Sequence, residues 1–279
     1  MALIRAGKGR IGGSTHTRAP QNSKYEGRVN RLESFYTGTR HSSSSTFFGI
    51  LWRLGPSGEA TLSSYFPMTN RPKEDSAFVT ISPKILYFGT PVALISSVDQ
   101  NGAPNLAPIS SFWALGWTVT LGLLEDTKTL HNLRNCADCV VNLPSPDMWR
   151  QVEKLAPLTG KNPVPEDKKE KFRFEQDKFH AGSFTRIPSE TVSAPRVREC
   201  PVQMEAVVRK IHKLEGDPRL EKLGGGSAVE VEILRVHVRS DFILKDNYID
   251  PGKWQPLVYN FRHYFGLGEE LGSTFRAEV

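Results

Sequence analysis

The chain has 279 residues, 38% of them hydrophobic and 10% aromatic, which is ordinary for a folded protein and allows a sizeable core. Its net charge of +6 would suggest a nucleic-acid or membrane surface only if that charge lay on the folded part. Residues 1–46 hold eight Lys or Arg against two Glu and so carry the whole excess, which leaves the remainder neutral. We therefore expect no nucleic-acid partner.

Cysteine content and hydropathy point to an intracellular protein. Three cysteines are too few, and odd in number, for a secreted disulfide scaffold, so a reducing compartment is favoured. No stretch approaches the ~20 apolar residues of a membrane-spanning helix, and the N-terminus lacks an apolar signal segment. We expect a cytoplasmic protein without a membrane partner. The alternative is mitochondrial, because the N-terminal stretch is rich in Arg, Ser and Thr and has no acidic residue before Glu26.

Composition divides the chain near residue 75. Residues 1–75 are basic and rich in Gly and Ser, which predicts a poorly structured extension. Residues 76–279 are expected to form one domain, beginning with a short strand at Phe78–Ile81. Next comes a predicted hairpin, in which Asn101-Gly102 lies at the turn and the arms are Val92–Val98 and Ala103–Phe112.

The rest of the domain alternates strands with a few helices. A helix is predicted to start at Thr127, another at Pro146–Leu155, and a strongly charged one at Pro163–Phe172. Apolar runs and period-two alternation predict further strands at Thr118–Leu124, Val140–Leu143, Val202–Leu214 and Ala228–Val238. Short connections make most of these strands antiparallel, and helices do not alternate regularly with them. The expected class is mainly β (α+β), a small antiparallel β-barrel with accessory helices.

The segment at the start of the first helix has the composition of a phosphate site. We predict Asp126 as the N-cap, which would leave free backbone N–H groups beside the Thr127 and Thr129 hydroxyls and the Lys128 ammonium. A plain capped helix with Lys128 in solvent is the alternative. Glu125 and Asp126 argue against a bound anion unless both carboxylates point away.

The second arm of the hairpin has the features of an open edge strand. Pro104 and Pro108 each remove a backbone donor, so this strand cannot be fully paired at the centre of a sheet. Asn105, Ser110 and Ser111 could then meet the polar edge of a planar heterocycle. The alternative is an edge strand whose polar residues simply face water.

Two other features carry less chemistry. Cys136 and Cys139 have CxxC spacing, but no further pair of soft ligands accompanies them, so we expect buried thiols and no metal. His180 lies in a region that could close over a pocket and act there, although a surface role is the commoner one. The sequence indicates no other catalytic residue.

Several segments, in this order, resemble the flavin reductase-like, FMN-binding split-barrel family, the group of flavoredoxin and of the reductase component of nitrilotriacetate monooxygenase. The similarity covers about residues 77–265 and is carried by Pro91–Phe112, Asp126–Leu133, Val140–Leu143, Phe179–Phe184, Ala194–Glu205 and Ile249–Tyr264. The family usually has Gly-Leu-Thr where this chain has Gly182-Ser-Phe184, and the basic N-terminal extension is unmatched. The expected fold becomes an antiparallel split barrel.

The resemblance also implies a function. FMN would lie at a homodimer interface, take hydride from NADH or NADPH, and pass electrons to an acceptor or a partner oxygenase. A non-catalytic FMN-binding or storage protein on the same barrel is the alternative. The family's contacts to the flavin ring and ribityl chain correspond to Ser96, Ser97, Asn105, Ala107, Ser110 and Ser111, and those to its phosphate correspond to Lys128, Thr129 and Asn132.

Overall fold

The computed structural model of the protein describes residues 53–54, 60–61 and 78–275. The chain divides into two compact units, residues 1–76 and 77–279. In the first unit, β1 (Arg53–Leu54) pairs antiparallel with β2 (Ala60–Thr61). The rest of the predicted extension over residues 1–75 lies outside the described residues.

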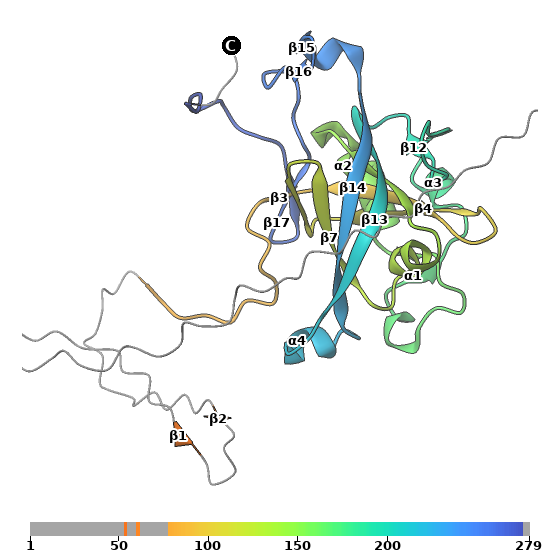
Figure 1. The fold of residues 1–279 in the computed structure, drawn as a ribbon, viewed down its shortest axis with the longest axis vertical. Helices are drawn as coiled ribbons and strands as arrows, with labels where there is room; N and C mark the ends of the chain where they lie inside the picture. The colour runs from red at the N-terminus through yellow and green to blue at the C-terminus, as the bar shows by residue number, and fades with distance from the viewer. Residues whose placement is uncertain (1–52, 55–59, 62–77, 276–279) are drawn as a thin grey trace, which may run out of the picture. The chain divides into compact units, whose positions relative to one another are not determined.

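Among the described residues of the second unit, seven antiparallel strands form the main sheet in the order β5-β4-β8-β13-β14-β7-β6. Long β13 and β14 lie side by side at its centre (Figure 1). This antiparallel sheet with few helices confirms the predicted class. The strands are β4 (Ala93–Val98), β5 (Pro104–Ile109), β6 (Phe112–Leu115), β7 (Thr118–Leu124), β8 (Asp138–Leu143), β13 (Val202–Leu214) and β14 (Gly226–Val238).

The two edge strands of this sheet, β5 and β6, are consecutive in the chain. Only Ser110 and Ser111 separate them, and residues rise at most about 3.6 Å each, so the two edges lie within about 11 Å of each other at this point. Ser111 already pairs with β7, since its carbonyl accepts from the Gly122 N–H at 2.6 Å. The sheet therefore curls on itself, and β5 and β6 flank the split of the barrel.

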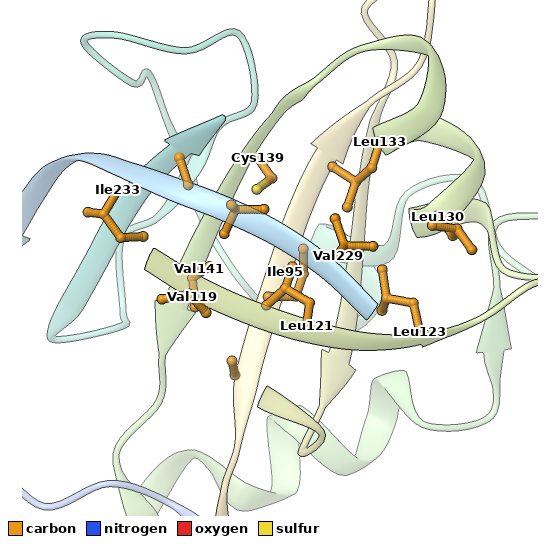
Figure 2. Close-up of a cluster of buried hydrophobic side chains, with 13 residues drawn as sticks. Ile95, Val119, Leu121, Leu123, Leu130, Leu133, Cys139, Val141, Val229 and Ile233 are labelled. Atoms are coloured by element: carbon orange, nitrogen blue, oxygen red, sulfur yellow. The ribbon is translucent and has the colours of Figure 1, made fainter. Parts of the chain in front are cut away.

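Alternating apolar residues fill the interior of the curled sheet. Figure 2 shows Val119, Leu121 and Leu123 following one another along β7, at every second position as strand geometry requires. Residues from β4, β8, β13 and β14 complete this cluster, together with Leu130 and Leu133 of α1 (Lys128–Asn135). Helix α1 is thus held against the sheet by its buried face.

A second cluster covers the opposite face of β4. Leu94 belongs to this second cluster, whereas its neighbour Ile95 belongs to the first, because successive side chains of a strand point to opposite faces. Helices α2 (Trp149–Leu155) and α3 (Lys178–Ala181) supply Val152, Leu155 and Phe179 to it. Burial on both faces explains why β4 is apolar or small along its whole length.

Short elements complete the second unit. They are β3 (Thr90–Pro91), η1 (Pro146–Met148), β9 (Leu158–Thr159), η2 (Glu166–Lys168), β10 (Arg173–Phe174), β11 (Arg186–Ile187), β12 (Arg196–Val197), α4 (Pro218–Glu221), η3 (Ser240–Phe242), β15 (Ile243–Lys245), β16 (Tyr248–Ile249), β17 (Val258–Asn260) and β18 (His263–Phe265). None of the helices in the described part of the chain is long and apolar enough to cross a membrane.

Two predicted elements are wrong. Residues Phe78–Ile81 form no strand, and Phe78, Val79 and Ile81 are exposed, so no neighbouring strand or core supports their β propensity. The charged helix predicted over Pro163–Phe172 is reduced to the single 3-10 turn η2. That segment has no apolar stripe to bury, and a helix that is polar all round gains little from packing.

Candidate functional site

The start of α1 is capped by Thr127 and not by Asp126. Thr127 has extended backbone angles, and its Oγ1 accepts from the Leu130 N–H at 3.3 Å and donates to the Leu124 carbonyl at 2.9 Å. The helix therefore begins at Lys128, one residue later than predicted. Thr127 can fill this role because the Asp126 carboxylate is drawn elsewhere, to two lysines that lie far away in sequence.

Both acids beside the helix start are neutralised by partners. Glu125 pairs with Arg134 at 2.7 Å and accepts from the Ser227 hydroxyl, and that hydroxyl and then Arg134 hold the pKa of Glu125 below its usual range. Asp126 pairs with Lys161 and, at 3.6 Å, with Lys168. The Lys161 hydrogen bond is the main cause of the lowered pKa of Asp126. Neither carboxylate is left without a cation to oppose an anion at the helix start.

A pocket of about 480 Å³ lies between the start of α1, the β4–β5 turn and the segment after α2. Lys128 lines it and pairs with Asp99 of the turn at 3.2 Å. Burial alone would raise the pKa of Asp99, but hydrogen bonds from Ala103 and Asn101 and the Lys128 charge hold it low. The pocket is lined by Asp99, Ala103, Pro104, Asn105, Lys128, His131, Gly160, Lys161, Asn162, Phe174, Glu175 and Gln176.

Two buried amides join α1 to the hairpin beside this pocket. The Nδ2 of Asn105 donates to Thr129 Oγ1 at 3.1 Å, and the Nδ2 of Asn132 donates to Ser97 Oγ at 3.1 Å. The Oδ1 atoms of Asn105 and Asn132 are buried and have no hydrogen-bond partner. An unsatisfied buried acceptor costs about 1–3 kcal/mol, so these two oxygens are places where a donor from a ligand would be stabilising.

Gly160 lets the loop after α2 approach the same residues. A Cβ at position 160 would lie 2.7 Å from Asn105 Oδ1 and 2.9 Å from Lys128 Cγ, so any side chain there would displace both. Sequence reasoning missed Gly160 and Lys161 as site residues. They lie more than 30 positions beyond Lys128, and only the fold brings them beside it.

The other residues assigned to the flavin ring lie further along β5 and just after it. Ser111 follows the far end of β5, where its hydroxyl donates to the Gly122 carbonyl at 3.0 Å and accepts from the Tyr87 hydroxyl at 3.4 Å. Ala107 and Ser110 are half-buried between Asn105 and this end. Five extended residues span about 17 Å, so Asn105 and Ser110 lie about that far apart along the chain, and β5 is an edge strand of the main sheet, as predicted.

Two of the predicted residues lie apart from this line. Ser96 is fully buried, and its hydroxyl donates to the Pro195 carbonyl at 2.5 Å, on the face of β4 opposite to Ser97. His180 is exposed on α3, where its backbone N–H donates to Asp177, and it does not line the pocket.

The cysteines have structural surroundings. Cys139 lies in the first core cluster, where burial raises the pKa of its thiol to about 12, and Cys136 ends α1. A thiol with so high a pKa stays protonated and is a poor nucleophile. No group of three His, Cys, Asp or Glu residues that could hold a metal ion occurs within the described ranges.

The arrangement suits an elongated, planar molecule with an anionic end. Lys128 and Lys161 supply cations at one end of β5, where Gly160 packs closely against Lys128 and Asn105. The orphaned Asn105 and Asn132 oxygens supply acceptors beside them. The edge of β5 toward Ser110 and Ser111 has backbone groups without a partner strand, because β5 pairs only with β4 among the described strands. These are the groups that a flavin mononucleotide would need.

Comparison with known proteins identifies a matching family and a relative of similar sequence. A family model described as "Flavin reductase like domain" matches residues 85–268. Uncharacterized protein YdfE of Bacillus subtilis (strain 168) is 42% identical over 209 residues, which cover 74% of this chain and 98% of YdfE.

Two solved structures are similar in fold. Flavoredoxin of Desulfovibrio vulgaris (Miyazaki F) has a TM-score of 0.58 and 22% identity, with 72% of this chain and 98% of that chain covered. Nitrilotriacetate monooxygenase component B from Bacillus cereus has a TM-score of 0.57 and 20% identity, with 71% of this chain and 100% of that chain covered.

Proposed function

Because this chain belongs to the flavin reductase-like domain family and is a flavin-related oxidoreductase of split-barrel fold, we propose that its flavin is FMN and its reductant NADH or NADPH. The observation that carries the proposal is the pocket at the start of α1. There, Lys128 of α1 meets Gly160 and Lys161 of the segment after α2 and Asn105 of β5, whose buried side-chain oxygen is unsatisfied.

Lys128 and Lys161 are proposed to hold the phosphate. Each now pairs with a carboxylate, Lys128 with Asp99 and Lys161 with Asp126, so each would exchange that partner for phosphate oxygens. Both lysines are only partly exposed, which keeps their charges close to the pocket. Thr129, held by the Asn105 amide, and Asn132, held by Ser97, support this end from the buried face of α1.

Residues of β5 and the segment after it are proposed to position the ring. Ala107 and Ser110 offer small side chains and an open strand edge to a planar molecule, and Ser111 is fixed by its bonds to Gly122 and Tyr87. Pro104 and Pro108 keep another strand from pairing along this edge. FMN supplies the redox chemistry when bound, accepting hydride from a nicotinamide and giving up electrons afterwards, while the protein sets its orientation.

We further propose a homodimer that serves a partner oxygenase or another electron acceptor. Trp113, Leu115 and Trp117 on and after β6 are 59%, 74% and 64% exposed, an unusual apolar density for a free surface. Trp117 is held against neighbouring β14, because its carbonyl accepts from the Ile233 N–H at 2.8 Å. A second copy of the chain would cover these exposed apolar side chains. The similarity in fold to component B of a monooxygenase supports the proposed oxygenase.

Anaerobic reduction of the FMN-loaded protein tests this function. Purified protein supplemented with FMN should retain the flavin through gel filtration and lose its yellow colour on addition of NADH or NADPH. Retention without bleaching by either nucleotide would contradict the reductase and favour FMN storage. A protein that retains no FMN would contradict both.

A further inference from the structure

A second pocket of about 490 Å³ lies between α2 and the β17–β18 hairpin. It shares no lining residue with the pocket at the start of α1. Its walls are Pro146, Trp149, Glu153, Leu257, Arg262, His263, Tyr264, Phe265 and Gly266. None of these residues belongs to the proposed flavin site, so this cavity needs an explanation of its own.

The walls are largely aromatic. Trp149 and Tyr264 face each other with ring centroids 6.2 Å apart and an interplanar angle of 36°. Outside the pocket lining, Arg150 lies over the Trp149 ring at 4.5 Å and fixes the indole. Phe265 is half exposed at the rim. Rigid aromatic faces of this kind favour a flat ligand, because offset or edge contacts between rings add to the gain from burial.

Arg262 gives the pocket a free cation. No ion pair of Arg262 occurs among those formed in the described part of the chain, and its guanidinium can donate two parallel hydrogen bonds. Glu153, the one acid of the lining, is engaged by the Tyr264 hydroxyl, which donates to it at 3.0 Å. Burial and then this carboxylate raise the pKa of Tyr264, so the hydroxyl keeps its proton and can donate to Glu153.

The backbone that presents Arg262 is strained. Phe261 and Arg262 form the two-residue loop between paired Asn260 and His263, and their φ angles are 45° and 69°. Positive φ at both central residues is the signature of a type I′ turn, which normally uses Asn-Gly. Phe261 is held there by an edge-on contact with Phe88 at 4.7 Å and by its N–H, which donates to the Tyr87 carbonyl at 3.2 Å.

Strain of this kind persists where the surroundings enforce it, and it concentrates at ligand sites. Glycine at position 262 would suit the turn better, yet the chain places there a long cationic side chain that lines an aromatic cavity. We propose that this pocket binds a planar aromatic carboxylate, with Arg262 pairing its carboxylate and Trp149, Tyr264 and Phe265 contacting its ring. This binding would not depend on the flavin assignment.

Calorimetric titration of the full-length protein with benzoate, without added FMN, tests the proposal. Benzoate should bind, while cyclohexanecarboxylate (the same charge without the aromatic ring) and benzyl alcohol (the ring without the charge) should each bind about tenfold more weakly or worse. Equal affinity for all three compounds, or no binding of benzoate at millimolar concentration, would overturn it.

The matched variants are Arg262→Gly and Lys154→Gln. Arg262→Gly removes the charge and relieves the positive φ, so benzoate affinity should fall about tenfold or more while the melting temperature stays equal or rises. Lys154→Gln removes a charge from the exposed face of α2, outside the pocket, and should leave benzoate affinity unchanged. Unchanged benzoate affinity in Arg262→Gly, in a protein that still melts cooperatively, contradicts the assignment.

Discussion

Two groups of buried polar side chains, on the main sheet and on helix α1 packed against it, differ in whether their hydrogen bonds are complete. Asn142 of β8 is fully buried, its Oδ1 accepts from the Val197 N–H at 2.9 Å, and its Nδ2 donates to the Leu94 carbonyl at 3.0 Å. Asn105 and Asn132 are similarly buried and of the same residue type, but each leaves its Oδ1 without a partner. The hydrogen bonds of the Asn142 amide are therefore complete within the fold, whereas those of the Asn105 and Asn132 amides are not.

Glu205 of β13 is a second buried polar side chain whose hydrogen bonds are complete within the chain. Its carboxylate has no exposure and accepts from the Glu190 and Thr191 N–H groups at 2.9 and 2.6 Å and from the Thr191 hydroxyl at 2.5 Å, with His237 at 2.7 Å. A buried ionised group is tolerated only when it is bonded in this way. We propose that polar burial serves stability where the bonds close within the chain and that, at Asn105 and Asn132, the open bonds serve a ligand.

Replacing Glu205 should have the largest effect on the fold. In Glu205→Gln an NH₂ group would face one of the backbone donors, so the free energy of unfolding should fall by about 3 kcal/mol. Urea unfolding measures this loss. The FMN affinity of the folded fraction should be unchanged, and a variant as stable as the wild type would show that this network contributes nothing to the fold.

The same carboxylate predicts an acid limit to stability. Burial alone would raise the pKa of Glu205, but the bonds from Thr191 and Glu190 and the His237 contact outweigh it and lower the pKa to about 2, from an ordinary value of 4.5. A lowered folded-state pKa contributes stability that is fully present above pH 4.5 and is lost as the pH falls toward 2. Unfolding free energies measured from about pH 6 to about pH 2 should fall more steeply for the wild type than for Glu205→Gln. Equal slopes for the two proteins would mean that another group sets the acid limit.

Lys128→Ala should have the largest effect on the proposed ligand. Loss of a charge-assisted contact to phosphate should weaken FMN binding by about 10–100-fold. Stability should change by less than about 1 kcal/mol, because the Lys128–Asp99 pair is partly exposed. Lys171→Ala is the control, since Lys171 is exposed and does not line the pocket. Flavin titration measures the FMN affinity of both variants, and equal affinities in Lys128→Ala and Lys171→Ala would refute the phosphate assignment.

The two asparagines offer the most direct test of the comparison. Asn142→Ala breaks bonds that close within the fold and should cost about 2 kcal/mol of unfolding free energy while leaving FMN affinity unchanged. Asn105→Ala removes an unsatisfied oxygen along with one bond to Thr129, so its cost in stability should be smaller. Its cost should appear instead as about tenfold weaker FMN binding. The opposite pattern would mean that unsatisfied amides do not mark the site.

Local patterns are sufficient to predict the strands that carry the fold. The expected bounds of β7 and β13 match the observed ones, because apolar residues run or alternate through them and turn residues delimit them. The start of α1 differs from its prediction by one residue, since Asp126 and Thr127 are both good N-caps and only the distant Lys161 and Lys168 decide between them. Elements whose formation depends on packing, such as the segment Phe78–Ile81, are beyond local reasoning.

The candidate site also has one part that local sequence patterns predict and one part that depends on the fold. Its sequence-local half, the hairpin and the helix start, is predictable from small polar residues and prolines. The other half, Gly160 and Lys161, follows α2 and forms part of the pocket only through the fold. Ser96 illustrates the reverse case, because a one-residue step along β4 turns its hydroxyl to Pro195 on the other face. No local pattern distinguishes it from Ser97.

Asp99→Asn should have the smallest effect on FMN affinity, and it should raise that affinity where Lys128→Ala and Asn105→Ala lower it. The Oδ1 of the new amide can still accept from the Asn101 and Ala103 N–H groups, so the β4–β5 turn should be kept. The substitution removes the carboxylate that pairs with Lys128 at 3.2 Å, which frees the ammonium for phosphate. FMN affinity should therefore rise about threefold, within the range measured for exposed ion pairs.

Flavin titration of Asp99→Asn beside a matched control measures this gain. Asp241→Asn removes an equal charge at an exposed site outside the pocket and should leave FMN affinity unchanged, so any effect of net charge alone would appear there. Weaker FMN binding in Asp99→Asn would mean that the Asp99–Lys128 pair positions the lysine for its ligand. In that case the Asp99 carboxylate would be a structural group like Asn142 and Glu205. Its contact with Lys128 would hold the lysine in place and would not compete with the phosphate.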